Sequence, residues 1–459
     1  MKNKSEFLCA ERLDDHWENY ARSLKPPFSA DSFLIEFLVH IFRNTALALE
    51  RLNGQNIYVK KIDSDFDRIP PRFHSIAKQL HKDGILEQVS FPKPIPDWPS
   101  IPALSLTFGQ GKTASGYALN YDTAATKAFA ELIEWHSLTI YNKKDFIYGS
   151  WNELKSKGAI DPRVFRGFQI DENARLSWTP CHSLFDNKKY FVPAQLVYLG
   201  YERLPEEPLI RQATTNGAAA GISRGKAMER AVLEAVERDA LMIHWLNKIT
   251  PPRIDIEGLQ ILGNETITRI VSEYRKYKID FAILDITADL GVPVILTVIR
   301  DGARGRPAVF LGAGAGLDIE SAIIHSLLEG LRAGYWSSVS DEQIEAVNKK
   351  ASLIENIEER RVYWCDKSRM PEADFLLSGP IKKIERNEFS GASSQKKMEH
   401  LIKILKARGI KAYVVDYATK AAKDAGLKIV KVLIPKLYYL YLNERFKHPG
   451  VNPIPHPFL

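Results

Sequence analysis

The sequence contains little cysteine and no long apolar run. Its three cysteines, Cys9, Cys181 and Cys365, are far apart and form no C-x-x-C pair. This spacing argues against a disulfide framework or a cysteine zinc site, and it suits a reducing compartment. No stretch of about 18 residues is apolar and uncharged, and residues 1–20 lack the apolar core of a signal peptide. We therefore expect a cytoplasmic protein without a membrane partner.

A strong charge bias is also missing. The net charge of +7 and the pI near 9.0 are mildly basic, but the charges are spread along the chain without an arginine-rich arm or a lysine block. This distribution argues against a nucleic-acid partner. The 459 residues suffice for two or three domains, or for one large core with an appendage.

Proline spacing divides the chain. Residues 1–90 have mainly helical patterns, and residues 72–91 resemble a helix, a glycine turn and a strand, as at the end of a winged-helix unit. Residues 91–102 predict an extended linker, because they contain prolines at 92, 94, 96, 99 and 102. Residues 103–459 are expected to form one large catalytic domain.

Strands and helices alternate beyond this linker, which predicts a mixed α/β domain. Strands are expected at 190–199, 279–287, 292–300 and 410–417, and long helices at 121–141, 226–246 and 318–336.

The three predicted helices place acidic residues inside apolar segments. Glu131 and Glu134 lie in the first, Glu234 and Glu237 in the second, and Glu329 in the third. Residues three apart share a helix face, and two carboxylates on one face repel each other more strongly as they leave water. Five such acids on converging helices would suit a hard divalent ion such as Mg²⁺, together with the phosphates of a nucleotide.

Ordinary helix-surface ion pairs are the alternative explanation. Arg230 lies four residues before Glu234 and Arg238 lies four after it, so both could pair with it in solvent.

The stretch "GQGKT" at 109–113 is not evidence for a nucleotide site. It resembles the end of a phosphate-binding loop, but Leu106 stands where that motif requires glycine, so we expect a plain turn.

Three acidic segments, in order and spacing, resemble the YcaO-domain family. They are "KAFAELIEW" (127–135), "TNGAAAGISRGKAMERAVLEAVERDAL" (215–241) and "ESAIIHSLLEGLR" (320–332). The resemblance extends over about residues 100–459. It implies a YcaO-type domain that binds ATP with Mg²⁺ ions and has no conventional phosphate-binding loop. Its implied metal and phosphate ligands are Glu131, Glu134, Glu234, Glu237 and Glu329, with Arg238 near the phosphates. Lys226 departs from the family pattern, and its fixed cation would either remove one metal or contact a phosphate directly.

The C-terminal stretch "NPIPHPFL" narrows the implied function. Pro453, Pro455 and Pro457 alternate up to Leu459, a pattern that keeps a tail extended. In the family this ending resembles that of azoline-forming cyclodehydratases, in which the tail enters the active site and the terminal carboxylate assists proton transfer. The resemblance thus implies an ATP-dependent cyclodehydratase that acts on Cys, Ser or Thr of a ribosomally synthesised precursor peptide, as in bacteriocin biosynthesis, by phosphorylating the backbone amide oxygen.

Four positions depart from the family pattern. Lys226 stands where an acid is usual, Ile222 where asparagine is frequent, Trp135 in place of an arginine and Arg332 in place of a glutamine. Two other functions therefore stay open: a thioamide-forming enzyme and a non-catalytic paralogue that serves as a peptide-binding scaffold. We expect a separate partner protein that binds the leader peptide, and a homodimer is one expected assembly.

Overall fold

The structure, a computed structural model, describes residues 66–457 except 110, 168–169, 303–306, 336–338 and 351–352. The described residues belong to one compact unit that begins at Asp65. Most of the predicted N-terminal helical region and the terminal Leu459 lie outside the described residues. None of the described helices is both long and apolar enough to cross a membrane.

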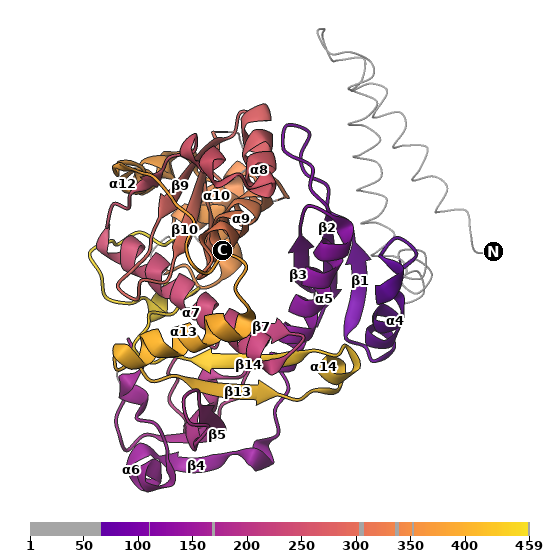
Figure 1. The fold of residues 1–459 in the computed structure, drawn as a ribbon. Helices are drawn as coiled ribbons and strands as arrows, with labels where there is room; N and C mark the ends of the chain where they lie inside the picture. The colour runs from indigo at the N-terminus through magenta and orange to yellow at the C-terminus, as the bar shows by residue number, and fades with distance from the viewer. Residues whose placement is uncertain are drawn as a thin grey trace, which may run out of the picture. The chain divides into compact units, whose positions relative to one another are not determined.

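A three-stranded antiparallel sheet opens this unit (Figure 1). Its strands are β1 (Leu86–Ser90), β2 (Ala103–Phe108) and β3 (Lys112–Tyr117), preceded by helix α4 (His74–Lys82). The predicted helix, glycine turn and strand are therefore present, with Gly84 at a positive φ of 69° between α4 and β1. The predicted linker joins two strands of this sheet. Within it, Trp98 is buried and its indole nitrogen donates to the Leu331 carbonyl at 2.9 Å.

Two larger sheets form the rest of the fold. One has the order β11-β10-β9-β8-β12, and the other has the order β4-β5-β13-β14-β7 with β6 paired to β5. The strands of the first are β8 (Arg253–Ile254), β9 (Asp280–Asp285), β10 (Val294–Arg300), β11 (Val309–Ala315) and β12 (Ile381–Lys382). Those of the second are β4 (Ile147–Ser150), β5 (Arg175–Ser183), β6 (Lys189–Pro193), β7 (Ala218–Gly221), β13 (Tyr413–Tyr417) and β14 (Lys428–Leu433).

Three helices carry the acidic residues and pack on these sheets. They are α5 (Tyr121–Leu138) on β2 and β3, α7 (Arg224–Asn247) on β7 and β14, and α9 (Ile319–Gly330) on β10 and β11. The other α-helices are α6 (Trp151–Leu154), α8 (Glu265–Lys276), α10 (Asp341–Asn348), α11 (Ile357–Tyr363), α12 (Asp374–Leu377), α13 (Ser394–Ala407) and α14 (Lys420–Asp424). The mixed α/β architecture is confirmed.

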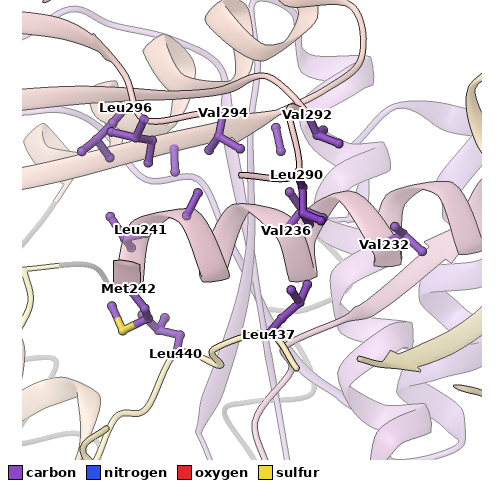
Figure 2. Close-up of a cluster of buried hydrophobic side chains, with 14 of the residues drawn as sticks. Val232, Val236, Leu241, Met242, Leu290, Val292, Val294, Leu296, Leu437 and Leu440 are labelled. Atoms are coloured by element: carbon purple, nitrogen blue, oxygen red, sulfur yellow. The ribbon is translucent and has the colours of Figure 1, made fainter. Parts of the chain in front are cut away.

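Helix α7 lies between the two larger sheets, because it also contacts β10 and β11. The Ser223 side chain caps its start by accepting from the Lys226 amide, and Lys248 ends it at a left-handed φ of 50°. Figure 2 shows Val294 and Leu296 of β10 on one side of the helix and Leu437 and Leu440 on the other. Apolar packing on two sides fixes α7 firmly, so the polar groups it carries have defined positions.

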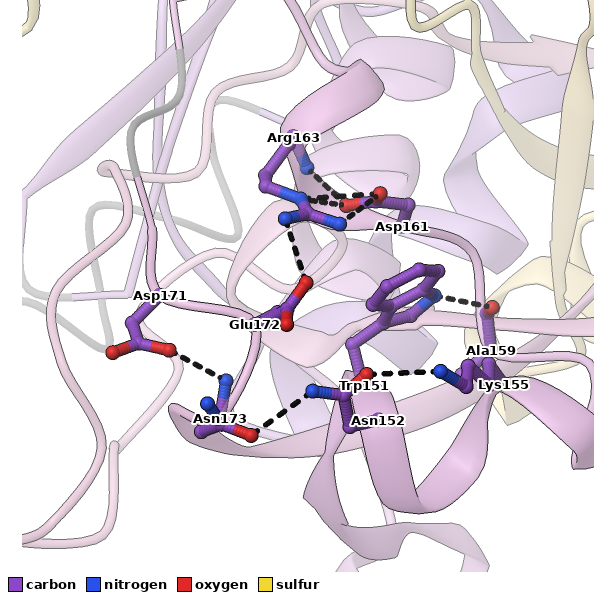
Figure 3. Close-up of polar contacts among 9 residues, drawn as sticks. All are labelled: Trp151, Asn152, Lys155, Ala159, Asp161, Arg163, Asp171, Glu172 and Asn173. Carbon is purple, nitrogen blue, oxygen red and sulfur yellow. Dashed lines mark hydrogen bonds and ion pairs between the residues drawn. The ribbon is translucent and has the colours of Figure 1, made fainter.

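A polar cluster marks the surface near β4 and β5 (Figure 3). The Arg163 guanidinium pairs with Asp161 at 2.8 Å and with Glu172 at 2.9 Å, and it lies over the Trp151 ring. These side chains are part-exposed, so they contribute little to stability.

Candidate active site

The five predicted acids form one chain of interacting carboxylates across α5, α7 and α9. The charge of Glu234 acts on Glu134, and that of Glu329 acts on both Glu131 and Glu237. The structure therefore brings together acids that are almost 200 residues apart in sequence.

Strand backbones help to position three of these carboxylates. The Ser115 amide of β3 donates to Glu131 at 2.8 Å. Backbone hydrogen bonds also reach Glu134 from Ala220 of β7 and Glu237 from Ala315 of β11. A strand from each of the three sheets thus donates an N–H to an acid, and such donors favour the charged carboxylate.

Arginines lie between the acids. Arg238 approaches Glu234 at 3.4 Å and Glu237 at 3.2 Å, and Arg332 pairs with Glu329 at 2.5 Å. Of the two helix-surface ion pairs that the sequence suggested for Glu234, the one with Arg238 is therefore present. In place of the other, the Arg230 guanidinium donates to the Ala220 carbonyl at 3.2 Å.

Burial and mutual repulsion dominate the electrostatics of four of the acids. Burial raises the pKa of Glu131 and of Glu234 to about 7, against the influence of Arg332 and Arg238 respectively. Burial, together with the Glu234 and Glu131 charges, raises the pKa of Glu134 well above its ordinary value. Burial also raises the pKa of Glu237.

Glu329 differs from the other four acids. Burial alone would raise its pKa, but the Arg332 and Lys127 cations hold it below the ordinary value. Four of the five acids thus keep raised pKa values despite the cations around them, so a further positive charge in the cluster would favour their ionised forms.

This donor set fits Mg²⁺ bound together with a nucleotide. Carboxylate oxygens are hard ligands, and a divalent cation would favour the ionised form of the four acids whose pKa values are raised. Within the part of the chain that the structure describes, no three Asp, Glu, His or Cys side chains form a ready-made cage for a metal. Mg²⁺ commonly takes one or two carboxylates, water and substrate phosphates, so the acids fit a shared site better than an all-protein one.

A buried lysine that sequence reasoning missed lies beside the cluster. Lys431 of β14 is fully buried, and its Nζ donates to the Thr214 carbonyl at 2.5 Å. Burial lowers its pKa to about 7, although the Glu234 and Glu134 charges favour its protonated form. A lysine in the apolar strand "KIVKVL" was the available signal, because a buried strand rarely carries an unpaired charge.

Arginines, Arg238 among them, also line a small cavity of about 40 Å³. Arg166 lies over the Tyr438 ring and Arg211 over the Tyr439 ring, with 4.0 Å and 3.9 Å to the ring centres. The cavity lining contains these two arginines and Arg238 but no carboxylate. Three guanidiniums around one space favour an anion.

Lys226, expected either to remove one metal or to contact a phosphate, pairs with an acid outside the set of five. Its Nζ pairs with Glu229 at 2.9 Å, and Glu229 also accepts from the Ser394 hydroxyl. Of the other departures from the family pattern, Ile222 is exposed and Trp135 packs edge-on against Phe108. The role of Lys226 stays a prediction, as do the ligand roles of the five acids.

The proline-rich tail is docked rather than free. Pro455 and Pro457 are buried and Pro453 is exposed. The Trp364 indole donates to the Pro455 carbonyl at 3.2 Å. The position of Leu459 lies outside the described residues, so its predicted role in proton transfer stays a prediction.

A family model covers most of this domain. The model described as YcaO cyclodehydratase, ATP- and Mg²⁺-binding, matches residues 115–438. An uncharacterized protein of Methanothermobacter thermautotrophicus is 24% identical over 271 residues, which are 58% of this chain and 67% of that protein. Residues 115–438, which the family model matches, contain all five acids and Arg238.

Three solved structures have a similar fold. A heterocyclase in complex with substrate and cofactor has a TM-score of 0.62 and 21% identity, and the match covers 79% of this chain and 52% of the heterocyclase. YcaO from Methanopyrus kandleri, bound with AMPPCP and Mg²⁺, has a TM-score of 0.58 and 17% identity, with coverage of 81% and 91%. The E. coli microcin synthetase McbBCD complex with pro-MccB17 bound has a TM-score of 0.54 and 15% identity, with coverage of 81% and 97%. The chain spans only about half the length of the heterocyclase.

Proposed function

This chain belongs to the YcaO family, which binds ATP and Mg²⁺, and on that premise we propose that it is a peptide cyclodehydratase. Its substrate would be a ribosomally synthesised precursor peptide, in which Cys, Ser or Thr becomes a thiazoline or an oxazoline. The observation that carries the proposal is the chain of five carboxylates on α5, α7 and α9, flanked by buried cations. The docked proline-rich tail supports azoline formation in particular.

The acids and the arginines of the cluster would have different roles in the reaction. Glu131, Glu134, Glu234, Glu237 and Glu329 would hold Mg²⁺. Arg238 and Arg332 would neutralise phosphate oxygens, because their guanidiniums already lie between the acids. This arrangement offers the positioning and charge neutralisation that phosphoryl transfer requires.

The proposed reaction closes a ring in the peptide. The thiol or hydroxyl adds to the preceding carbonyl carbon and gives its proton to a base, for which the Leu459 carboxylate is the candidate. ATP supplies the phosphoryl group that makes the carbonyl oxygen a leaving group. Loss of phosphate and of the amide proton leaves the C=N bond of the azoline, with ADP and phosphate as co-products. Binding in a fixed geometry promotes the ring closure.

Two alternatives make different predictions. A thioamide-forming enzyme would need external sulfide, and its peptide product would keep its side chains uncyclised. A peptide-binding scaffold would show no ATP turnover. The pairing of Lys226 with Glu229 favours an active enzyme over a scaffold, because Lys226 then occupies none of the five acids. We also propose a separate leader-binding partner, a cytoplasmic location and a homodimer as one assembly to test.

Calorimetric titration with AMPPCP and Mg²⁺ tests the nucleotide site. We expect micromolar binding to the wild type and about 100-fold weaker binding to Glu234→Gln, at the upper end of what the loss of a metal-site contact costs. Glu358→Gln, at a carboxylate that is 72% exposed on α11, is the matched control and should bind normally. Peptide-dependent phosphate release with loss of 18 Da from the peptide would then identify cyclodehydration. Normal binding by Glu234→Gln would contradict the assigned site.

A further inference from the structure

The cavity lined by three arginines is built from separate parts of the chain. Arg238 belongs to α7, Arg211 to the segment between β6 and β7, and Arg166 to the loop that precedes β5. Arg211 is 5% exposed and Arg166 is exposed, so one guanidinium lies inside the protein and another at its surface. The space of about 40 Å³ is roughly three times what one water molecule needs, which suits a small ion and excludes a nucleotide.

Two hydrogen bonds hold the segment that carries Tyr438 and Tyr439. The Tyr438 amide donates to the Asp239 carboxylate at 2.7 Å, and the Arg166 amide donates to the Pro435 carbonyl at 3.0 Å. The Tyr438 and Tyr439 rings each lie under one guanidinium of the cavity. The positions of these cations are therefore set by the protein itself before any ligand binds.

Positive charge dominates the lining of the cavity. The described residues that line it include three arginines and no carboxylate. Asp239, next to Arg238 in the chain, is not among them, and burial raises its pKa to about 7. Burial lowers the pKa of His448 to about 4 and that of Lys431 to about 7, and the Arg211 charge contributes in both cases. A bound anion would offset this charge.

We propose that the cavity is an oxyanion site, separate from the nucleotide, that receives the phosphate released on ring closure. The choice of phosphate rests on the proposed cyclodehydratase function. One guanidinium can satisfy one carboxylate, whereas three guanidiniums match the several oxygens and the higher charge of phosphate. None of the five acids lines the cavity, so Mg²⁺ and the nucleotide phosphates would lie outside it. Arg238 joins the two sites, because it also pairs with Glu234 and Glu237.

Titration of the full-length protein with inorganic phosphate, in the presence of saturating AMPPCP and Mg²⁺, tests the site. We expect a dissociation constant of about 1 mM, which two or three charge-assisted hydrogen bonds allow. Acetate should bind at least about tenfold more weakly. Arg166→Gln should weaken phosphate binding about tenfold, because it removes one such hydrogen bond, and should keep the AMPPCP affinity within about twofold of the wild type.

Arg163→Gln is the matched control. The Arg163 side chain is 41% exposed, and its guanidinium also lies over an aromatic ring, that of Trp151 at 4.8 Å, but it does not line the cavity. Its substitution should leave phosphate and AMPPCP binding unchanged. Equal weakening of phosphate binding in Arg163→Gln and Arg166→Gln would reduce the effect to general surface charge and overturn the site.

A kinetic measurement links the site to the reaction. Phosphate should inhibit peptide cyclisation at about its dissociation constant, and Arg166→Gln should need about tenfold more phosphate for the same inhibition.

The remaining outcomes separate the site from the function. Loss of phosphate binding in the presence of AMPPCP would make the cavity part of the nucleotide site and overturn the proposal. Equal affinity for acetate and phosphate would overturn the assignment of phosphate and indicate a carboxylate of the peptide. A wild type that binds phosphate as expected, but turns over no ATP with candidate peptides, would overturn the proposed function and leave the oxyanion site in place.

Discussion

Arg360 and Arg163 are both ion-paired, but only Arg360 is buried. The Arg360 side chain is 0% exposed beside Glu444, whereas Arg163 is 41% exposed between Asp161 and Glu172 (Figure 3). Removing one member of a buried pair leaves the other charge without compensation. We expect Arg360→Met to lower the free energy of unfolding by about 3 kcal/mol, and Arg163→Met by less than about 1 kcal/mol. Urea unfolding checks both, and equal losses would contradict the argument.

His448 makes stability dependent on pH. It is 1% exposed, and its Nε2 lies 2.9 Å from the Tyr439 carbonyl. Burial lowers its pKa to about 4, against an ordinary value of 6.5. Between these values the unfolded chain binds a proton that the folded protein does not, so stability falls as the pH drops from 6.5 to 4. The full effect is about 3 kcal/mol.

Urea midpoints of the wild type and of His448→Gln across this pH range isolate the contribution of His448. Because other histidines also titrate, the prediction concerns the difference between the two proteins. The wild type should lose more stability than the variant as the pH falls. Parallel curves for the two proteins would rule out His448 as the source.

At the scale of elements, close contact between strand and helix sets the place of Glu329. A Cβ added at Gly314 of β11 would lie 2.3 Å from the Ala322 carbonyl of α9. Gly314→Ala should therefore push α9 away and lower stability by about 2 kcal/mol. Gly225→Ala is the matched control, because its Cβ meets no atom within 4 Å in the first turn of α7. It should stabilise by about 0.5 kcal/mol, and thermal melting compares the two.

Local patterns predicted most elements but not all their ends. The expected helix at 226–246 is α7, and the expected strand at 292–300 is β10. The expected strand at 190–199 stops at Pro193, after which the chain makes a 3₁₀ turn. Proline cannot donate a hydrogen bond to a neighbouring strand, so the end of this strand at Pro193 could have been predicted from the sequence. The order of strands in the sheets could not be predicted, because pairs such as β13 and β5 join distant parts of the chain.

At the scale of the whole molecule, helix periodicity predicted which acids share a face but not which cations meet them. Arg238 follows Glu234 by one turn, so their proximity could be predicted. Lys431 comes from β14, and its approach to Glu134 and Glu234 depends on how a sheet packs against two helices. Such long-range packing leaves no periodic signal in the sequence.

The assembled site predicts joint stabilisation by nucleotide and metal. Acids from three helices repel one another, and AMPPCP with Mg²⁺ would join α5, α7 and α9 through one ligand. At 100 times its dissociation constant, a ligand that binds only the folded state adds about 2.7 kcal/mol. For a chain of this size, we expect the Tm to rise by several degrees with both present. Mg²⁺ alone should have little effect, because the described acids form no ready-made cage without phosphate oxygens. The rise should be lost in Glu329→Gln and kept in Glu358→Gln. An equal rise with Mg²⁺ alone would instead indicate an all-protein metal site.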